Sequence, residues 1–307
     1  MIMAKRDILS VLDMKNDLDE IINLSIELKK NRYRSYESLR NKMLGLIFEK
    51  PSTRTRTSLE VAIDQLGGHA VYLNPSEMQL GRGETISDTG HVLSRFLDAI
   101  AYRAFDHKNV VELARSTSIP VINALDDVEH PLQIVADFMT VKEKKGKFSG
   151  LKFSYIGDGN NMANSLMLGA AILGVDIYVA TPHGYEPKSE FVDKAKQVAK
   201  ERGSKVIITN DAIEAAKDAD VIYTDVWISM GEESKRGEKE KAFTKYQINS
   251  DLVSNAKKDY IFMHCLPAHR GLEVTDDVAD SINSVIFDEA ENRLHSEKGV
   301  LYKLLSY

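Results

Sequence analysis

The residues with the most evident chemistry are the hydroxyl and guanidinium groups of EKPSTRTRT, residues 49–57. This stretch brings three cationic and four hydroxyl side chains together just before an apolar helical pattern begins. The first turn of a helix has free backbone N–H groups and the positive end of the helix dipole, and an arginine fork can hold two phosphate oxygens. The stretch predicts an anion site, although an ordinary capped helix with surface arginines fits its local pattern equally well.

Individual residues of this stretch are expected to divide the work. Ser52 or Thr53 is placed to cap the helix, and Pro51 fixes the entry of the chain. Because successive helical side chains diverge, Arg54 and Arg56 are not expected to face one ligand together. We expect Arg54 to face the ligand and Arg56 to hold the turn in shape. The stretch is not a P-loop, because the pattern G-x-x-x-x-G-K-[ST] is absent.

Two further elements of the first half can complete a site for a small anion. In EHPLQ, Pro131 suits the first position of a helix, so His130 and Gln133 lie at its start. His130 can donate to a carbonyl oxygen and Gln133 can hold an amide N–H, although a capping histidine is the better interpretation of this motif alone. Arg103 ends a strand pattern, and the carboxyl ends of parallel strands form the crevice where such folds bind ligands.

The second half places polar residues at three predicted strand ends. YIGDGNNMANSL does not fit the dinucleotide fingerprint, because Met162 replaces its last glycine, and the pair Asn160 and Asn161 suits a carboxylate or amide contact better. Asp225 follows another strand pattern, four residues before SMG. The only cysteine, Cys265, follows a third. A lone buried cysteine is usually inert, but one at a strand end beside an anion pocket is a better functional candidate.

These motifs together resemble a known family. STRTR after a strand, Arg103 at a strand end and HPLQ at a helix start resemble the carbamoyl-phosphate half of the aspartate/ornithine carbamoyltransferase family. The D-x-x-x-S-M-G and HCLP segments are similar to its ornithine-using members, and the aspartate-using members have neither. The resemblance covers nearly the whole chain. It implies transfer of the carbamoyl group of carbamoyl phosphate to the δ-amine of L-ornithine, giving L-citrulline and phosphate, in arginine biosynthesis or, in reverse, in arginine catabolism.

The resemblance also implies roles for individual residues of this chain. Carbamoyl phosphate would be bound by Ser52, Thr53, Arg54, Thr55, Gln79, Arg103, His130, Gln133, Cys265, Leu266 and Arg293. Ornithine would be bound by Asn161, Asp225, Ser229 and Met230. The catalytic groups would be Arg54, Arg103, His130, Asp225 and Cys265. Gln79 matches a family position that reaches into a neighbouring subunit's site, which implies a homotrimer or a multiple of trimers. No metal and no cofactor is implied.

Composition argues against nucleic-acid and membrane partners, and the resemblance implies small-molecule substrates and other copies of the chain. The length of 307 residues fits two domains. The net charge of −6 argues against a general nucleic-acid binder. No apolar run approaches the roughly 20 residues of a membrane helix, and we identify no signal peptide. A single cysteine excludes an internal disulfide, and the cytoplasm is the expected compartment.

The elements that must position these residues follow from hydrophobic patterning. Nearly continuous apolar runs alternate with helical patterns, which predicts an α/β fold with two domains, each a doubly wound parallel sheet flanked by helices. Strands are expected at 43–49, 69–74, 98–103, 120–125, 152–158, 176–182, 205–210, 220–227 and 260–267.

The basic, glycine-containing segment 142–152 is the expected boundary between the two domains. We expect a carbamoyl-phosphate-binding domain over 1–145 and an ornithine-binding domain over 146–307. A C-terminal helix over 289–307 is expected to pack back on the first domain. The charged segment 231–242 is interpreted as a mobile loop or as a solvated surface turn.

Two alternative functions stay open at this point. A relative that carbamoylates another amine, such as putrescine or lysine, would share the first half of the chain. A nucleotide-binding dehydrogenase or a non-catalytic α/β binding module would share the fold. Met162, and the lack of a catalytic acid–base pair near residues 155–166, count against this second class.

Overall fold

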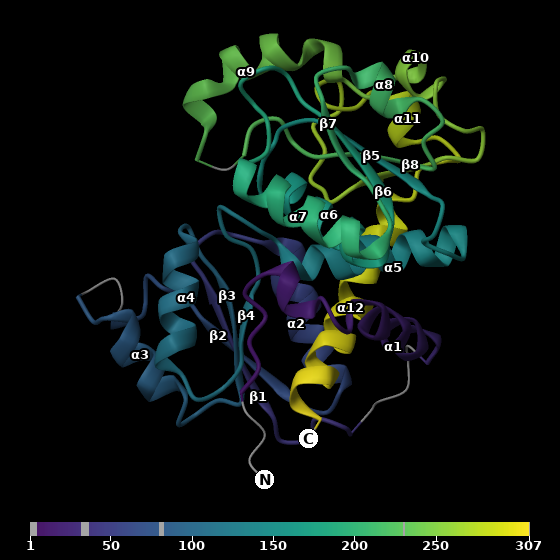
Figure 1. The fold of residues 1–307 in the computed structure, drawn as a ribbon. Coiled ribbons are helices and arrows are strands. Elements are labelled where there is room, and N and C mark those ends of the chain that lie inside the picture. Colours follow the sequence, from purple (N-terminus) through teal and green to yellow (C-terminus); the bar gives the residue numbers. More distant parts are fainter. Residues whose placement is uncertain (1–4, 32–36, 80–82, 230, 307) are drawn as a thin grey trace. The chain divides into compact units, whose positions relative to one another are not determined.

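The structure is a computed structural model that describes residues 5–31, 37–79, 83–229 and 231–306 (Figure 1). It divides into two compact units, one of Met1–Met139 with Glu291–Tyr307 and one of Thr140–Ala290. Each unit holds one parallel sheet with helices on both faces, which confirms the predicted fold class. Over the described ranges, no helix is long and apolar enough to cross a membrane.

The first unit is built on a four-stranded parallel sheet in the order β2-β1-β3-β4. Its strands are β1 (Met43–Phe48), β2 (His69–Leu73), β3 (Ala99–Arg103) and β4 (Val121–Asn123). The chain passes from β1 outward to β2 and then returns to the other side of β1, so the strand order reverses between β1 and β3. At such a switch point the loops at the carboxyl ends of the strands diverge and leave a crevice.

Helices cover both faces of this sheet. Figure 1 shows α3 and α4 on one face and α1 and α2 on the other. The bounds are η1 (Val11–Met14), α1 (Leu18–Lys30), α2 (Thr53–Gln65), α3 (Ile86–Leu93) and α4 (His107–Ser116). Two more helices, α5 (Pro131–Lys145) and α12 (Ile286–Leu305), begin in one unit and end in the other.

The C-terminal helix α12 packs on the first unit, as predicted. Its Lys298 donates to the side chain of Gln65 in α2, and its Lys303 bonds Glu20 in α1. Gly299 lies so close to α1 that an added Cβ would come within 2.1 Å of Ser25 Oγ. A side chain at this position would therefore push the two helices apart.

The second unit has a five-stranded parallel sheet in the order β7-β6-β5-β8-β9. Its strands are β5 (Lys152–Ile156), β6 (Asp176–Ala180), β7 (Val206–Thr209), β8 (Val221–Thr224) and β9 (Ile261–His264). The order reverses between β5 and β8, which makes a second switch point. Helices α6 (Asn161–Leu173) and α7 (Ser189–Arg202) lie side by side on one face. Further helices are α8 (Ala212–Ala216), α10 (Ser250–Val253) and α11 (Asp276–Ala279).

The segment 231–242 is mostly helical, so its interpretation as a loop or surface turn was wrong. It forms η3 (Glu233–Lys235) and most of α9 (Arg236–Phe243), which η4 (Thr244–Tyr246) follows. An Arg236–Glu240 ion pair one turn apart supports the helix. Phe243 is fully buried and stacks on Trp227, which anchors the helix in the core.

Candidate active site

The first switch point begins where β1 leads into α2. Ser52 is the N-cap, since its Oγ accepts from the backbone N–H of Thr55 at 3.2 Å. This leaves Thr53 as the first helical residue. Thr55 is buried and Arg54 is half-buried. The turn therefore places the hydroxyl of Thr55 inside the unit, at the positive end of the helix dipole.

Arg56 makes structural contacts away from this turn. Its guanidinium lies 3.5 Å from the ring centroid of Tyr72, and its Nε lies 2.9 Å from Glu60 Oε1. These contacts fix Arg56 on the face of α2 that packs against β2.

Sheet register places Arg103 beside the carboxyl end of β1. Arg103 pairs with Phe48 across β1 and β3, and it is 5% exposed. Lys50, which sequence reasoning did not include among the site residues, is almost as buried, and its Nζ lies 4.7 Å from the ring centroid of Phe105. Burial, and then the charge of Arg103, lower the pKa of Lys50. Two cations are thus held close together at the end of this sheet.

Helix α5 starts at Pro131, as predicted, with His130 directly before it. His130 is fully enclosed, and its pKa is lowered well below the usual 6.5, first by burial and then by the charges of Arg293 and Arg103. At neutral pH His130 is therefore an uncharged imidazole, which can donate one hydrogen bond to a ligand oxygen.

Arg293 of α12 connects the other residues of this site. Its Nη1 donates to Gln133 Oε1 at 2.6 Å, and its Nη2 donates to Thr55 Oγ1 at 3.1 Å. Gln133 is oriented from its other end, because its Nε2 donates to Asp137 Oδ1 at 2.8 Å. Residues far apart in the sequence are thus joined into one buried hydrogen-bonded cluster. Sequence patterns alone could not reveal these links.

The second switch point lies between β5 and β8, and β9 is the next strand beside β8. Register pairs Thr224 with His264, so the next residues, Asp225 and Cys265, leave the sheet side by side. The thiol of Cys265 donates to Asp225 Oδ1 at 3.1 Å. The other oxygen, Oδ2, accepts from Asn160 Nδ2 at 2.9 Å. The carboxylate of Asp225 is therefore held in a fixed orientation from both sides.

The HCLP turn is held by His264. The backbone N–H of Leu266 donates to His264 Nδ1 at 2.9 Å, which requires the ring proton on Nε2, 3.3 Å from Glu273 Oε1. Leu266 itself has a φ of 58°, in the left-handed region that side chains rarely adopt. Ligand atoms of Asp225, His264 and Cys265 lie within 4.8 Å of one another. Because Nδ1 is occupied by the Leu266 N–H, these three residues fit a hydrogen-bonding cluster better than a metal site.

The other residues predicted to bind ornithine are Asn161, Ser229 and Met230, which follow Asn160 and Asp225 in the chain. Asn161 is the first residue of α6, and the preceding Asn160 caps the helix by accepting from the N–H groups of the next turn. Ser229 follows β8 and is half-buried. Met230 lies outside the described residues.

A buried lysine holds the segment that follows Ser229. Lys239 of α9 is 3% exposed and pairs with Asp158 Oδ2 at 2.7 Å and with Glu232 Oε2 at 2.5 Å. Burial acts to lower the pKa of Lys239, but its bonds to these two carboxylates raise it, so it stays charged. The pairs connect the loop after β5 with the loop after β8. Sequence analysis missed Lys239 because it lies in a charged segment that looks solvated.

The predicted site residues thus fall into two groups, each assembled within its own unit. The first unit brings together Thr55, Arg103, His130, Gln133 and Arg293 beside the Ser52 cap. The second brings together Asp225 and Cys265, next to the start of α6. Cys265 and Leu266, assigned to carbamoyl phosphate, belong to the second unit. Gln79 is exposed in a turn before α3 and joins neither cluster.

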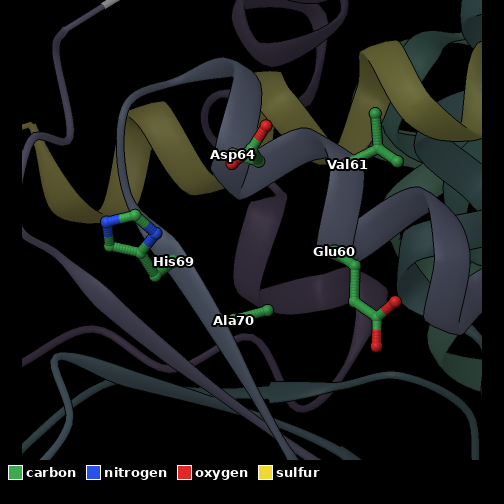
Figure 2. A pocket seen from close by; sticks show the side chains of 5 residues that line it. All are labelled: Glu60, Val61, Asp64, His69 and Ala70. Carbon is green, nitrogen blue, oxygen red and sulfur yellow. The ribbon is translucent and has the colours of Figure 1, made fainter.

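A surface hollow on the first unit contains none of these residues. It is lined by Glu60, Val61 and Asp64 of α2 and by His69 and Ala70 of β2 (Figure 2). Its two carboxylates make it unsuited to a phosphate. This hollow therefore does not suit the predicted anion site.

Comparisons with known proteins also divide the chain into two parts, although the second family model includes residues 291–304, which the structure places in the first unit. A model of the carbamoyl-phosphate-binding domain of aspartate/ornithine carbamoyltransferases matches residues 6–143, and a model of the Asp/Orn-binding domain matches residues 149–304. The chain is 88% identical over 305 residues to a protein of Thermoplasma acidophilum named catabolic ornithine carbamoyltransferase, covering 99% of this chain and 100% of that protein.

Two further relatives are similar over almost their whole length. An ornithine carbamoyltransferase of Picrophilus torridus is 64% identical over 302 residues, which cover 98% of this chain and 100% of that protein. The solved structure of ornithine carbamoyltransferase from Pyrococcus furiosus matches with a TM-score of 0.95 and 52% identity, covering 98% of this chain and 97% of that chain.

Proposed function

The chain belongs to the aspartate/ornithine carbamoyltransferase family, and from this premise we propose how its residues share the reaction. It transfers the carbamoyl group of carbamoyl phosphate to the δ-amine of L-ornithine, giving L-citrulline and phosphate. The observation that carries the proposal is the opposite chemistry of the two switch points. Cationic and uncharged donors gather at the first, and a carboxylate with a thiol gathers at the second.

We assign carbamoyl phosphate to the first switch point. The phosphate would lie against the start of α2, where Ser52, Thr53 and Arg54 supply hydroxyl, backbone and guanidinium donors. Arg103 would add charge to the same group. An amide oxygen accepts two hydrogen bonds, so Gln133 Oε1 keeps one lone pair for the carbamoyl NH₂ while it accepts from Arg293.

The carbonyl oxygen of the carbamoyl group becomes negative in the tetrahedral intermediate. Thr55 accepts from Arg293, so its own hydroxyl proton can point to this oxygen. Neutral His130 can donate to it as well. Together with Arg103 these residues would form an oxyanion hole made of side chains. Losing one such donor typically costs roughly 3–4 kcal/mol of barrier.

We assign ornithine to the second switch point. Asp225, fixed by Cys265 and Asn160, would hold the α-ammonium group. Asn161 and Ser229 would contact the amino-acid carboxylate, together with Met230. The thiol of Cys265 donates a hydrogen bond to Asp225, which leaves the sulfur lone pairs to accept a hydrogen bond from an N–H of the δ-amine. Cys265 therefore orients the nucleophile and forms no covalent bond.

Proton transfer needs no further base in this scheme. An alkylammonium has a pKa of about 10.4, so on the order of one ornithine in a thousand carries a neutral δ-amine at neutral pH. The neutral amine attacks the carbamoyl carbon, the C–O bond to phosphate breaks, and the leaving phosphate can take the proton that the nitrogen loses. The family resemblance also implies that Leu266, together with Cys265, contacts carbamoyl phosphate. The same residues serve the reverse reaction.

We further propose that the chain works as a homotrimer or a multiple of trimers. Gln79 is exposed, and the family pattern gives this position a role in a neighbouring subunit's site. Mixing two inactive variants, Arg54→Ala and Gln79→Ala, after reversible dissociation should restore part of the wild-type activity, because some sites then draw both residues from intact copies. No restoration, with trimers verified by light scattering, would contradict a shared site. A cytoplasmic location stays a prediction, which rests on the single cysteine and hence on the lack of an internal disulfide.

The acceptor is tested by comparing rates with different amines. The reaction rate with ornithine should exceed the rates with putrescine, lysine and aspartate. Only ornithine combines an α-ammonium group for Asp225 with a δ-amine at the right distance. Putrescine lacks the α-carboxylate, so Asn161 and Ser229 would have no partner. Equal rates with ornithine and putrescine would contradict the assignment of the second switch point.

A further inference from the structure

The chain contains two Arg–Glu pairs with the same helical spacing in opposite surroundings. Arg56 and Glu60 lie on α2, with side chains 42% and 36% exposed. Arg293 and Glu297 lie on α12, with side chains 4% and 0% exposed. An exposed pair of this kind adds a few tenths of a kcal/mol to a helix. The buried pair needs a different explanation, because burying two charges costs much of what their attraction returns.

Glu297 contacts the residue that joins the proposed carbamoyl phosphate site. Its Oε1 accepts from Arg293 Nη2 at 2.7 Å, the same nitrogen that donates to Thr55. Arg293 Nη1 is occupied by Gln133. Both ends of the guanidinium are therefore fixed, one of them by Glu297. No residue role that the sequence motifs supply includes Glu297.

We propose that Glu297 is a positioning residue of the carbamoyl phosphate site, which fixes Arg293 and sets how much of its positive charge is offered to an anion. The inference rests on the proposed assignment of Arg293 to that site. A carboxylate and a protonated carboxyl group both keep an oxygen that accepts from Nη2, so position is maintained in either state. Only the carboxylate cancels the charge of Arg293.

The ionisation of Glu297 changes near neutral pH. Burial raises the pKa of Glu297 to about 7, although Arg293 and the hydroxyl of Ser58 act in the opposite direction. An anion bound at Arg293 would raise this pKa further, because like charges repel. By linkage, anion binding takes up a proton, and affinity falls as pH rises through about 7.

Other charged or titratable groups also lie around this pair. His130 stays neutral, because its pKa lies well below 6.5. Lys298, next on α12, is turned to Gln65. Arg103 stays charged at every pH of interest. Asp137 bonds Gln133, and Lys50 lies beside Arg103. A variant that changes Glu297 alone separates its contribution from theirs.

The test measures sulfate as a competitive inhibitor against carbamoyl phosphate, at constant ionic strength, between about pH 6 and about pH 8.5. Sulfate stays dianionic over this range, so any pH dependence belongs to the protein. In the wild type the inhibition constant should rise roughly tenfold toward high pH. Glu297→Gln keeps an oxygen acceptor without the charge, and it should stay within about twofold of the low-pH wild-type value throughout. Glu60→Gln, the matched exposed variant, should behave as the wild type.

The possible results separate the inference about Glu297 from the assignment of Arg293 to the anion site. If sulfate inhibits equally at all pH values in the wild type, or if Glu297→Gln keeps the wild-type pH dependence, the inference about Glu297 is wrong and the anion site stands. If Arg293→Met does not weaken sulfate inhibition, Arg293 is not at the anion site, and the proposed assignment falls together with the inference. Folding of Glu297→Gln is checked by thermal denaturation, and a wild-type profile without pH dependence would contradict the inference even if this variant is unstable.

Discussion

The two switch points have the same topology and opposite chemistry. In the first unit the strand order reverses between β1 and β3, and in the second between β5 and β8. The first crevice holds Arg103, Arg293 and neutral His130. The second holds Asp225 and Cys265. The same strand topology can therefore carry cationic or acidic residues, depending on which side chains the strand ends and the neighbouring helices supply.

The two regions also differ in how their residues are held. In the first, Arg293 is hydrogen-bonded inside the unit to residues of α2 and α5. In the second, the loop after Ser229 is held by Glu232, whose partner Lys239 lies on a short helix. Glu232 is half-buried, so water competes for this pair more than for the bonds of Arg293. We infer a preformed anion site and a more adjustable amino-acid site.

The largest expected effect separates two neighbouring arginines of α2. Arg54→Ala should lower kcat/KM by roughly 100-fold to 1,000-fold, because it removes a charged donor from the developing negative charge. Arg56→Ala, the control, should stay within about threefold of the wild type, since it loses only an exposed pair with Glu60 and its contact with Tyr72. Steady-state kinetics on both folded variants decides this, and a reversed order would contradict the division of labour within STRTR.

The next effect tests whether the thiol belongs to the amine side. Cys265→Ser shortens the bond to Asp225 and replaces a soft sulfur acceptor, so the KM for ornithine should rise by roughly tenfold to 100-fold. The dissociation constant of carbamoyl phosphate should change by less than about threefold. Isothermal titration measures this second constant directly. Equal losses for both substrates would remove the distinction between the two regions.

The fold was largely predictable because its signals are local. Each of the nine predicted strand runs contains a strand of the structure. Several runs were too long at their carboxyl ends, as at Glu49, Asp158 and Asp225. There the chain leaves the sheet, and the polar side chains accept hydrogen bonds from neighbouring segments. The helical segment 236–243 was missed because its charged residues look solvated, although Phe243 and Lys239 are buried.

The site was predictable only in part. Motifs could indicate Arg54, Arg103 and His130, since each follows a strand or starts a helix. The cross-links among Arg293, Gln133 and Thr55 join residues up to 238 positions apart, and no local pattern encodes such a contact. Glu297 was missed because a glutamate on a helix usually faces water, and its sequence surroundings do not show that it is buried.

A smaller effect addresses the adjustable loop. Lys239→Met removes both ion pairs but keeps the buried stem, so the loop of Glu232 loses its anchor. The KM for ornithine should rise roughly threefold to tenfold with little change for carbamoyl phosphate. Arg236→Met, which breaks only the exposed pair with Glu240 on the same helix, is the control. An unchanged ornithine KM in Lys239→Met would show that the loop needs no such anchor.

The last prediction concerns Glu129, a buried acid of the first unit. Its substitution should have the smallest effect on activity but a measurable effect on stability. Burial raises the pKa of Glu129 to about 7, against its bonds from Ser10 and Val11. A raised carboxyl pKa stabilises the fold at low pH, and this stabilisation is lost as pH rises from about 4.5 through about 7. Glu129→Gln should therefore be less sensitive to pH than the wild type across this range. Denaturant unfolding at several pH values checks this, and parallel pH curves would contradict the raised pKa.

The most direct test of the two-site account is the binding of phosphonoacetamide, which carries a phosphonate and an amide but no amino-acid part. Isothermal titration compares the wild type with Arg54→Ala and Asp225→Asn. The account predicts that Arg54→Ala weakens binding by roughly 100-fold, whereas Asp225→Asn stays within about threefold of the wild type. Equal weakening in both variants, or a loss confined to Asp225→Asn, would contradict the assignment of the anion to the first switch point.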